Sequence, residues 1–560
     1  MTEKQTKRTK KLRWLVFFAL LLIFSVWGLF TSEPKNMTYA PSGAVYAEEA
    51  AKAAENIDFA DVAWMITASG LVMLMTPGLS LFYGGMVRPK NVISTMVQSI
   101  VSIGLVSVLW VVVGFSLAFG NSWHGLIGNP WQFFMFQNVG ASPNGIGSEI
   151  KMSDYVPVTR IDGAVVPDTT FDAAKLAGGE SVSVVSAQDA AQAANGGKIA
   201  EECVITATKT GNRFFNYGVL GLSIPLVLYA LFQMKFAIIT PALITGSFAE
   251  RVHFSGYLVF MTLFTIFIYA PLAHWTWHPD GLLAWMGVRD FAGGIVVHAS
   301  SGVAALAGAL YLGRRVEPGE HSPANIPLVL LGACLLWFGW FGFNGGSFLR
   351  ADAGAVKAFL NTNTASAAAM LTWFLLDAVL GRKPSAMGVA VGAVAGLVGI
   401  TPCAGWVTAG VALFIGTFIA IVCNTMVHWR AQHPKLDDAL DVFSTHGVGG
   451  IVGTILTGFF VGVLVEHGGA MAFWMHVLGI SLVFVYSFVV SLLLYWVTDK
   501  LVNMRVSAAH ERLGLDRSQH GEHYGIVYED DEHELRESAE AAKAARAAYV
   551  ESAAASNEKI

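Results

Sequence analysis

Long apolar runs recur along nearly the whole chain and are separated by short polar segments. A run of about 20 apolar residues is long enough to cross the hydrocarbon core of a bilayer as an α-helix. We count eleven such runs after residue 57. The pattern predicts an all-α integral membrane protein with eleven transmembrane helices, at approximately residues 59–85, 92–119, 225–248, 255–277, 291–313, 326–348, 357–380, 385–401, 407–429, 443–465 and 471–498.

Three polar regions flank or interrupt this membrane domain, which we place at residues 58–505. Within residues 1–57, a basic stretch precedes an apolar run from Trp14 to Phe30, which is typical of a signal sequence or an uncleaved signal anchor. Residues 121–215 form a polar insertion, for which we expect an external loop or small cap. Residues 506–560 form a charged tail, in which 529–559 have the composition of a cytosolic helix or a partly disordered arm.

The amino-acid composition and the absence of certain motifs argue against several classes of protein. Only 13% of the residues are charged and 54% are apolar, whereas soluble domains have about 25% charged residues. The basic residues form no stripe that would neutralise a nucleic acid, so we expect no nucleic-acid partner. The four cysteines have no CxxC or zinc spacing, and there is no GxxxxGK phosphate loop. If the protein transports a solute, we therefore expect passive or secondary transport. We expect no enzymatic activity, no metal and no cofactor.

The basic residues in the short loops predict an orientation. Lysine and arginine in such loops are retained on the cytoplasmic side of the membrane. When eleven helices are threaded, the strongly basic loops fall on one side, and they contain Arg88 with Lys90, Arg251, Arg314 with Arg315, Arg382 with Lys383, and Arg430 with Lys435. We expect a multi-pass protein of the cell (inner or plasma) membrane, with the N-terminus of the mature chain outside and the C-terminus in the cytosol.

Two histidines lie in matching segments of predicted spans. His298 follows Asp290-Phe-Ala-Gly-Gly, and His446 follows Asp441-Val-Phe-Ser-Thr, each among small residues that let helices approach closely. A lone histidine in a span is more often a core residue, but the pairing favours a pore site. The segments open the fifth and tenth spans, as an inverted repeat of five plus five helices would place them.

With these segments, the sequence resembles the ammonium transporter and Rhesus protein family over roughly residues 58–525. The further motifs that carry the resemblance are Thr76-Pro-Gly-Leu, Phe82-Tyr-Gly-Gly, Phe232-Gln-Met-Lys-Phe-Ala, Gly246-Ser-Phe-Ala-Glu-Arg, Trp340-Phe-Gly-Phe-Asn, Gly399-Ile-Thr-Pro-Cys, Gly514-Leu-Asp and His520-Gly-Glu. The resemblance implies a homotrimer in membrane lipid, with ammonium or ammonia as substrate. It also implies that a PII-type regulatory protein can bind the cytosolic face.

The resemblance also implies roles for individual residues. Phe236 and Phe343 match the stacked phenylalanines at the outer mouth of the pore, and Trp277 and Ser347 match the outer recruitment site. Asp290 matches a buried structural aspartate near that site, and it is also expected to cap its helix. Aromatic faces attract cations, and a hydroxyl accepts hydrogen bonds that ammonium donates and potassium does not. The alternative for these aromatic residues is ordinary packing.

The expected mechanism separates ammonia from its proton. An apolar pore disfavours a bare cation, so ammonium is expected to lose its proton, while two imidazoles that share one proton can relay it. The alternatives are an ammonium sensor of the same fold and a Rhesus-like ammonia gas channel. Lys235 adjoins Phe236, and it is expected to face away from the pore or to pair with an acid.

The remaining polar residues are given ordinary roles. Asp441 is expected to cap the tenth span without joining the site, and His476 is expected to be a core histidine. Five further histidines near the predicted span ends are expected to lie at the membrane interface: His253, His274, His278, His433 and His467.

Overall fold

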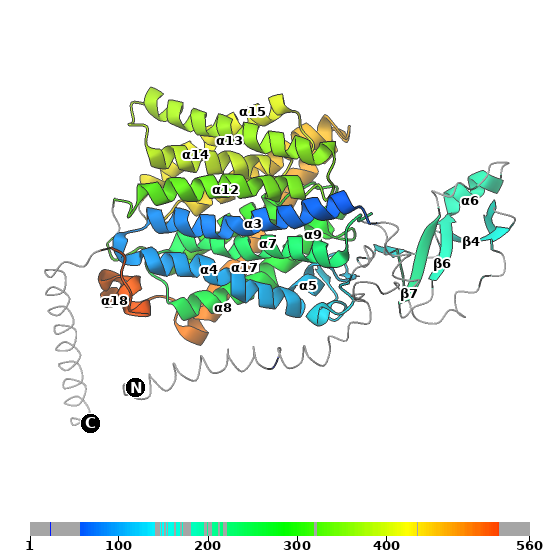
Figure 1. The fold of residues 1–560 in the computed structure, drawn as a ribbon, viewed down its shortest axis with the longest axis horizontal. Helices are drawn as coiled ribbons and strands as arrows, with labels where there is room; N and C mark the ends of the chain where they lie inside the picture. Colours follow the sequence, from blue (N-terminus) through cyan, green and yellow to red (C-terminus); the bar gives the residue numbers. More distant parts are fainter. Residues whose placement is uncertain are drawn as a thin grey trace, which may run out of the picture.

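The computed structural model describes residues 57–140, 221–317, 322–433 and 435–525, together with residue 23 and parts of 146–216. Long helices lie side by side and form one bundle (Figure 1). Nine helical stretches in the described part are long and apolar enough to cross a membrane: Phe59–Met86, Pro89–Phe119, Leu226–Phe248, Phe254–Trp285, Gly294–Leu312, Ile326–Gly346, Ala409–Ala431, Phe443–Val463 and Gly469–Val502. The chain is therefore a helical, multi-pass membrane protein.

The helices of the bundle follow in chain order. They are α3 (Phe59–Met86), α4 (Val92–Leu109), α5 (Phe115–Phe119), α7 (Leu226–Phe248), α8 (Phe254–Phe264), α9 (Ala270–Trp277), α10 (Leu282–Trp285), α11 (Ser300–Leu312), α12 (Ile326–Gly346), α13 (Ala353–Val379), α14 (Ala386–Ile400), α15 (Ala409–Ala431), α16 (Val448–Thr457) and α17 (Gly469–Val502). Five π-helical segments continue these helices: η2 (Trp110–Gly114), η7 (Thr265–Tyr269), η8 (Gly294–Ala299), η9 (Phe443–Gly447) and η10 (Gly458–Val463).

Nine of the predicted spans thus coincide with helices that meet the length and hydropathy of a membrane span. The other two predicted spans are helices as well, but they fall short in different ways. Helix α13 has 27 residues and contains Lys357, Asn361 and Asp377, which lower its hydropathy. Helix α14 is apolar but has only 15 residues. The number of eleven spans remains a prediction.

Local sequence explains where several helices begin. Asp58, Asn325, Asp352, Ser385 and Thr408 each precede a helix, and each side chain accepts a hydrogen bond from a backbone N–H of the first turn. Such caps satisfy amide groups that have no partner inside the helix. The short polar links between apolar runs therefore set the boundaries of these helices.

Small residues bring the helices close together. A Cβ atom on Gly332 of α12 would lie 2.6 Å from the carbonyl oxygen of Gly78 in α3. Only glycine allows this approach, because carbon atoms in normal contact are about 3.5 to 4.0 Å apart. In a lipid environment, such close backbone contact is a main source of helix association. It fixes α12, which carries Trp340 and Phe343, against α3.

The insertion differs from the sequence prediction because part of it forms a sheet. A hairpin of β1 (Ser122–Trp123) and β2 (Ile127–Gly128) precedes an antiparallel six-stranded sheet in the order β3-β8-β7-β6-β4-β5. Its strands are β3 (Ser148–Ile150), β4 (Tyr155–Ile161), β5 (Ala164–Pro167), β6 (Ser181–Ser186), β7 (Ile205–Thr210) and β8 (Arg213–Asn216), with helices η3 (Phe134–Phe136) and α6 (Ala187–Ala194). The prediction of an all-α chain is therefore wrong for this region.

The sheet and the C-terminal helix α18 (Ala508–Leu513) lie at opposite ends of the bundle (Figure 1). The chain after α17 folds back onto the bundle. Asp516, at the start of the π-helix η11 (Asp516–His520), accepts hydrogen bonds from the backbone N–H groups of Ile93 and Ser94 at the start of α4, at 3.0 and 2.7 Å. The carbonyl oxygen of the Gln519 side chain accepts one from Phe254 N at 2.7 Å. The segment thus caps two helices.

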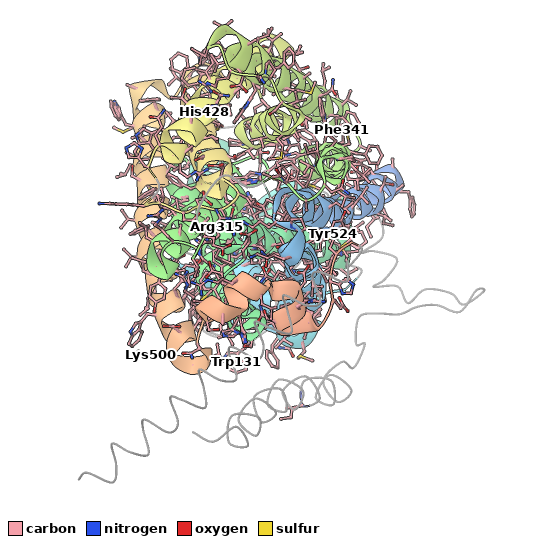
Figure 2. All side chains as sticks on the ribbon, turned by 90° about the vertical axis from the view of Figure 1, so that its left-hand side faces the viewer. Trp131, Arg315, Phe341, His428, Lys500 and Tyr524 are labelled. Carbon is pink, nitrogen blue, oxygen red and sulfur yellow. The ribbon has the colours of Figure 1, made fainter. Side chains whose placement is uncertain are left out.

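Buried ion pairs hold the same end of the bundle together. Arg315, labelled near the centre of that end in Figure 2, donates from two guanidinium nitrogens to both carboxylate oxygens of Asp437, at 3.0 and 2.9 Å, and from the third to Glu250 at 2.9 Å. Burial raises the pKa of Asp437, but the hydrogen bonds of Arg315 and the charge of Arg251 outweigh it and lower the pKa to about 2. Asp437 therefore remains ionised at neutral pH.

The predicted signal sequence or anchor at residues 1–57 lies outside the described residues except at positions 23 and 57. The predicted arm at 529–559 also lies outside them.

Candidate functional site

His298 and His446 meet inside the bundle. His298 lies in η8 and His446 in η9, and both side chains are buried. Their Nδ1 atoms are 3.2 Å apart, and the rings lie 5.3 Å apart at 23°. A hydrogen bond between two Nδ1 atoms requires a proton on one and a lone pair on the other. The pair is thus arranged to share one proton.

Each histidine occupies a π-helical turn at the start of its helix, and glycine contacts bring the two helices close together. A Cβ on Gly450 of α16 would lie 2.6 Å from Gly294 O, 2.7 Å from Ala299 N and 3.1 Å from the Cβ of His298. The backbone of Gly447 likewise occupies the place that a Cβ on Gly302 would take. Short π-helical segments within α-helices are frequent at functional sites.

A narrow cavity reaches the histidine pair. Its volume is about 10 Å³, enough for one water-sized molecule. Apart from the two histidines, its lining is apolar: Met75, Leu79 and Phe82 from α3, Ile239 and Leu243 from α7, Leu336, Trp340 and Phe343 from α12, and Val394 from α14. Such a lining accepts a small neutral molecule and strongly disfavours a bare ion.

Stacked aromatic rings adjoin this cavity. The rings of Phe236 and Phe343 lie 4.3 Å apart at 37°, and Phe343 is 5.8 Å from the ring of His298. Trp340 stacks on His298 at 5.1 Å, and its Nε1 donates to Thr401 Oγ1 at 2.9 Å. Phe343 therefore lies next to the histidine pair, and Phe236 stacks on Phe343.

Phe236 contacts Trp277 as well as Phe343. Its ring is 6.0 Å from Phe236 at 81°, and its Nε1 donates to the carbonyl oxygen of Asp290 at 3.0 Å. The Asp290 carboxylate is buried and accepts hydrogen bonds from four backbone N–H groups, those of Gly293, Gly294, Ile295 and Val296, at 2.8 to 3.3 Å. The expected capping role of Asp290 is therefore present.

Ser347 directly follows α12, one turn beyond Phe343. Its hydroxyl donates to the carbonyl oxygen of Phe343 at 2.7 Å. The hydroxyl hydrogen is thereby used, so the lone pairs on the oxygen remain as hydrogen-bond acceptors. Ser347 and Trp277 are both only partly buried, in contrast to Phe236 and Phe343.

Lys235 does not line the cavity between the phenylalanines and the histidines. It is half-buried. Among the described residues, no carboxylate forms an ion pair with it, so the expected acidic partner is not found there.

The expectation for Asp441 is wrong. Asp441 does not cap the tenth span: its carboxylate binds Arg430 at 2.6 and 3.0 Å, and Asp438 instead accepts the hydrogen bond from Phe443 N at 2.8 Å. The backbone of Asp441 has a φ of 56°, so it belongs to a turn before the helix. The spacing of an acid before a helix does not show which of two nearby acids faces the first N–H groups.

His274 and His278 are fully buried within the protein, and their rings stack at 4.4 Å. Nδ1 of His274 is 2.9 Å from Ala118 O, so it carries the hydrogen, and Nε2 then accepts from the hydroxyl of Ser122 at 2.8 Å. Ser122 belongs to the hairpin β1–β2. The hairpin is thus bound through His274 to the end of α9 that carries Trp277. The sequence position of His274 near a span end did not reveal this contact.

Known proteins resemble this chain over most of its length. The sequence matches the Ammonium Transporter Family over residues 63–162 and 197–524. It is 37% identical over 472 residues to an ammonium transporter of Bacillus subtilis (strain 168), an alignment that covers 82% of this chain and 97% of that protein. The unmatched residues 163–196 lie within the insertion.

Solved structures show the same fold. The structure of Mep2 from Candida albicans matches with a TM-score of 0.63 and 29% identity over 81% of this chain and 88% of that one. A structure described as a sensor Amt protein matches with a TM-score of 0.63 and 27% identity over 82% of this chain and 98% of that one. With a family match over more than half of its length, the chain belongs to the ammonium transporter family.

Proposed function

We propose that this protein moves ammonium across the cell membrane by separating it into ammonia and a proton. The observation that carries the proposal is the cavity beside the stacked phenylalanines, whose only ionisable lining residues are His298 and His446. A neutral molecule the size of ammonia fits this environment, and a cation does not. Membership of the ammonium transporter family supplies the substrate.

Ammonium binds first at an outer site formed by Trp277, Phe236, Phe343 and Ser347. The aromatic faces attract the cation with about 0.5 to 2 kcal/mol per contact. The hydroxyl oxygen of Ser347 accepts a hydrogen bond from an N–H of ammonium, which potassium cannot donate. The site therefore favours ammonium over potassium of similar charge.

The ion then loses its proton, and ammonia enters the apolar passage. The stacked phenylalanine pair lies between the outer site and the cavity in this proposal and keeps hydrated ions out of it. His298 and His446 relay the proton, because their Nδ1 atoms are 3.2 Å apart and one proton can pass between them. Net movement is electrogenic, since both ammonia and the proton cross.

Electrical recording on purified protein in liposomes tests this proposal. Ammonium is expected to evoke a current, methylammonium a smaller one and potassium none. His298→Ala and His446→Ala are expected to abolish the ammonium current while the protein remains folded. Equal potassium and ammonium currents in the wild type would exclude the outer site as the source of selectivity. No response to any of the three cations would favour a sensor of the same fold.

The same proposal covers the topology and assembly. The chain has eleven spans in an inverted repeat of five plus five, with the insertion outside and the C-terminal segment in the cytosol. The location of the sheet and of α18 at opposite ends of the bundle supports this orientation (Figure 1). Three copies form a trimer in membrane lipid, and a PII-type protein binds the cytosolic face. Crosslinking of the purified protein tests the trimer.

A further inference from the structure

A short loop before η8 carries Asp290, and three successive residues fasten it. The N–H of Arg289 donates to Nε2 of His476 in α17 at 2.9 Å. The carbonyl oxygen of Asp290 accepts from Trp277 Nε1 at 3.0 Å, and the N–H of Phe291 donates to Pro402 O at 3.0 Å. His476 is the one of these anchors that is a side chain outside the proposed outer site. It binds Arg289, the residue directly before Asp290.

The surroundings of His476 select one form of its ring. Nδ1 is 2.8 Å from the carbonyl oxygen of Ala472, so Nδ1 carries the hydrogen. Nε2 is then a bare acceptor, which is what the N–H of Arg289 requires. The side chain is fully buried, and a Cβ on Gly458 would lie 2.7 Å from the Cβ of His476, so the ring has little freedom to move.

A second contact binds the loop to the same face of α17. A Cβ on Gly479, one turn after His476, would lie 2.9 Å from a methyl group of Val288. Val288 and Arg289 therefore both rest on α17, with His476 providing the directional bond and Gly479 the close approach. The loop cannot shift along α17 without losing the bond from Arg289 to Nε2.

We infer that His476 is a positioning residue for ammonium binding, acting through Arg289 and Asp290 on the indole of Trp277. This inference rests on the proposed function of the outer site. The chain of bonds is continuous: His476 Nε2 holds Arg289 N, and the next residue holds the Trp277 ring by its carbonyl oxygen. Loss of the acceptor removes one anchor of the loop directly before Asp290, so the ring face that attracts the cation is held less firmly.

Substitutions that keep or remove the acceptor test the inference. His476→Leu fills similar volume without an acceptor, whereas His476→Gln supplies an amide oxygen to Arg289 N. Ammonium-evoked currents of purified protein in liposomes give KM and maximal current per folded molecule. Loss of one buried hydrogen bond predicts a KM about threefold to tenfold higher for His476→Leu, with little change in maximal current. His476→Gln is expected to restore KM to within about twofold of the wild type.

Glu466→Gln is the matched control. It removes the ion pair of Glu466 with the Arg289 side chain at 2.9 Å, which is exposed and contributes little, but leaves the bond to Nε2 intact. Its KM is expected to equal that of the wild type. A His476→Leu protein with unchanged KM, or one that only loses folded protein, would overturn the inference while the proposed function stands. A wild type without saturable ammonium current would overturn both.

Discussion

Gly450→Ala places one methyl group between the two histidine segments. The new Cβ would lie 2.6 Å from Gly294 O and 2.7 Å from Ala299 N. Normal contact is about 3.5 Å, so α16 and η8 must separate by about 0.8 to 0.9 Å. Both neighbours are backbone atoms, which cannot swing aside as a flexible side chain does. A separation of this size lengthens the bond of 3.2 Å between His298 and His446 beyond hydrogen-bond range.

Two quantities are expected to change in Gly450→Ala. Overpacking of this kind lowers the free energy of unfolding by about 1 to 3 kcal/mol. The ammonium current per folded molecule is expected to fall by about tenfold to a hundredfold, because a misplacement near 1 Å is enough to impair proton transfer. Thermal unfolding monitored by size-exclusion chromatography and currents in liposomes measure the two effects.

Gly104→Ala provides the control, because a Cβ on Gly104 in α4 meets no atom within 4 Å. This variant is expected to retain the stability and the current of the wild type. If Gly450→Ala carried the same current as Gly104→Ala, the contact between the histidine segments would not be required for transport.

Three further predictions concern the outer site and the C-terminal end of the bundle. Ser347→Ala removes an acceptor for ammonium and is expected to raise KM about fivefold to tenfold and to reduce selectivity against potassium, measured by currents. Asp437→Asn leaves Arg315 with one carboxylate partner and is expected to destabilise the protein at neutral pH by on the order of 3 kcal/mol. The pKa of Asp437 is about 2 in the folded protein and about 3.9 in the unfolded chain, so the stabilisation by Asp437 is present above about pH 4 and is lost as the pH falls through about 2. Acid-unfolding scans of the variant should lack this step. Asp516→Asn weakens the cap on α4 and is expected to speed tryptic cleavage after Arg517, measured by mass spectrometry.

The sequence was most informative where one physical requirement dominates. A helix in a bilayer must be long and apolar, so nine predicted spans coincide with helices that meet both conditions. The histidine pair could be predicted because two segments share the same arrangement of acid, aromatic residue and small residues. In the structure, these two side chains meet at 3.2 Å.

The parts that the sequence did not reveal depend on contacts between distant segments. The alternating β-branched residues of β6 and β7 indicate strands, but the low apolar content of the insertion concealed them. The roles of His274 and His476 depend on Ser122 and Arg289, which lie 152 and 187 residues away in the chain. No pattern around either histidine indicates such a partner.

The π-helical turns at His298 and His446 are also contact-dependent. Glycine-rich sequence permits them, and in the structure Gly450 closely approaches the backbone of η8. The choice between the two acids before η9 also depends on a contact. Asp438 caps the helix, because Arg430 binds the carboxylate of Asp441.

The central claim is that ammonia and a proton cross together through the site of His298 and His446. Simultaneous recording of current and of internal pH in liposomes that contain the wild-type protein tests it most directly. The account predicts an ammonium-dependent inward current that is lost in His298→Ala. Alkalinisation of the liposome interior by ammonia without any current would contradict it and would identify the protein as a gas channel.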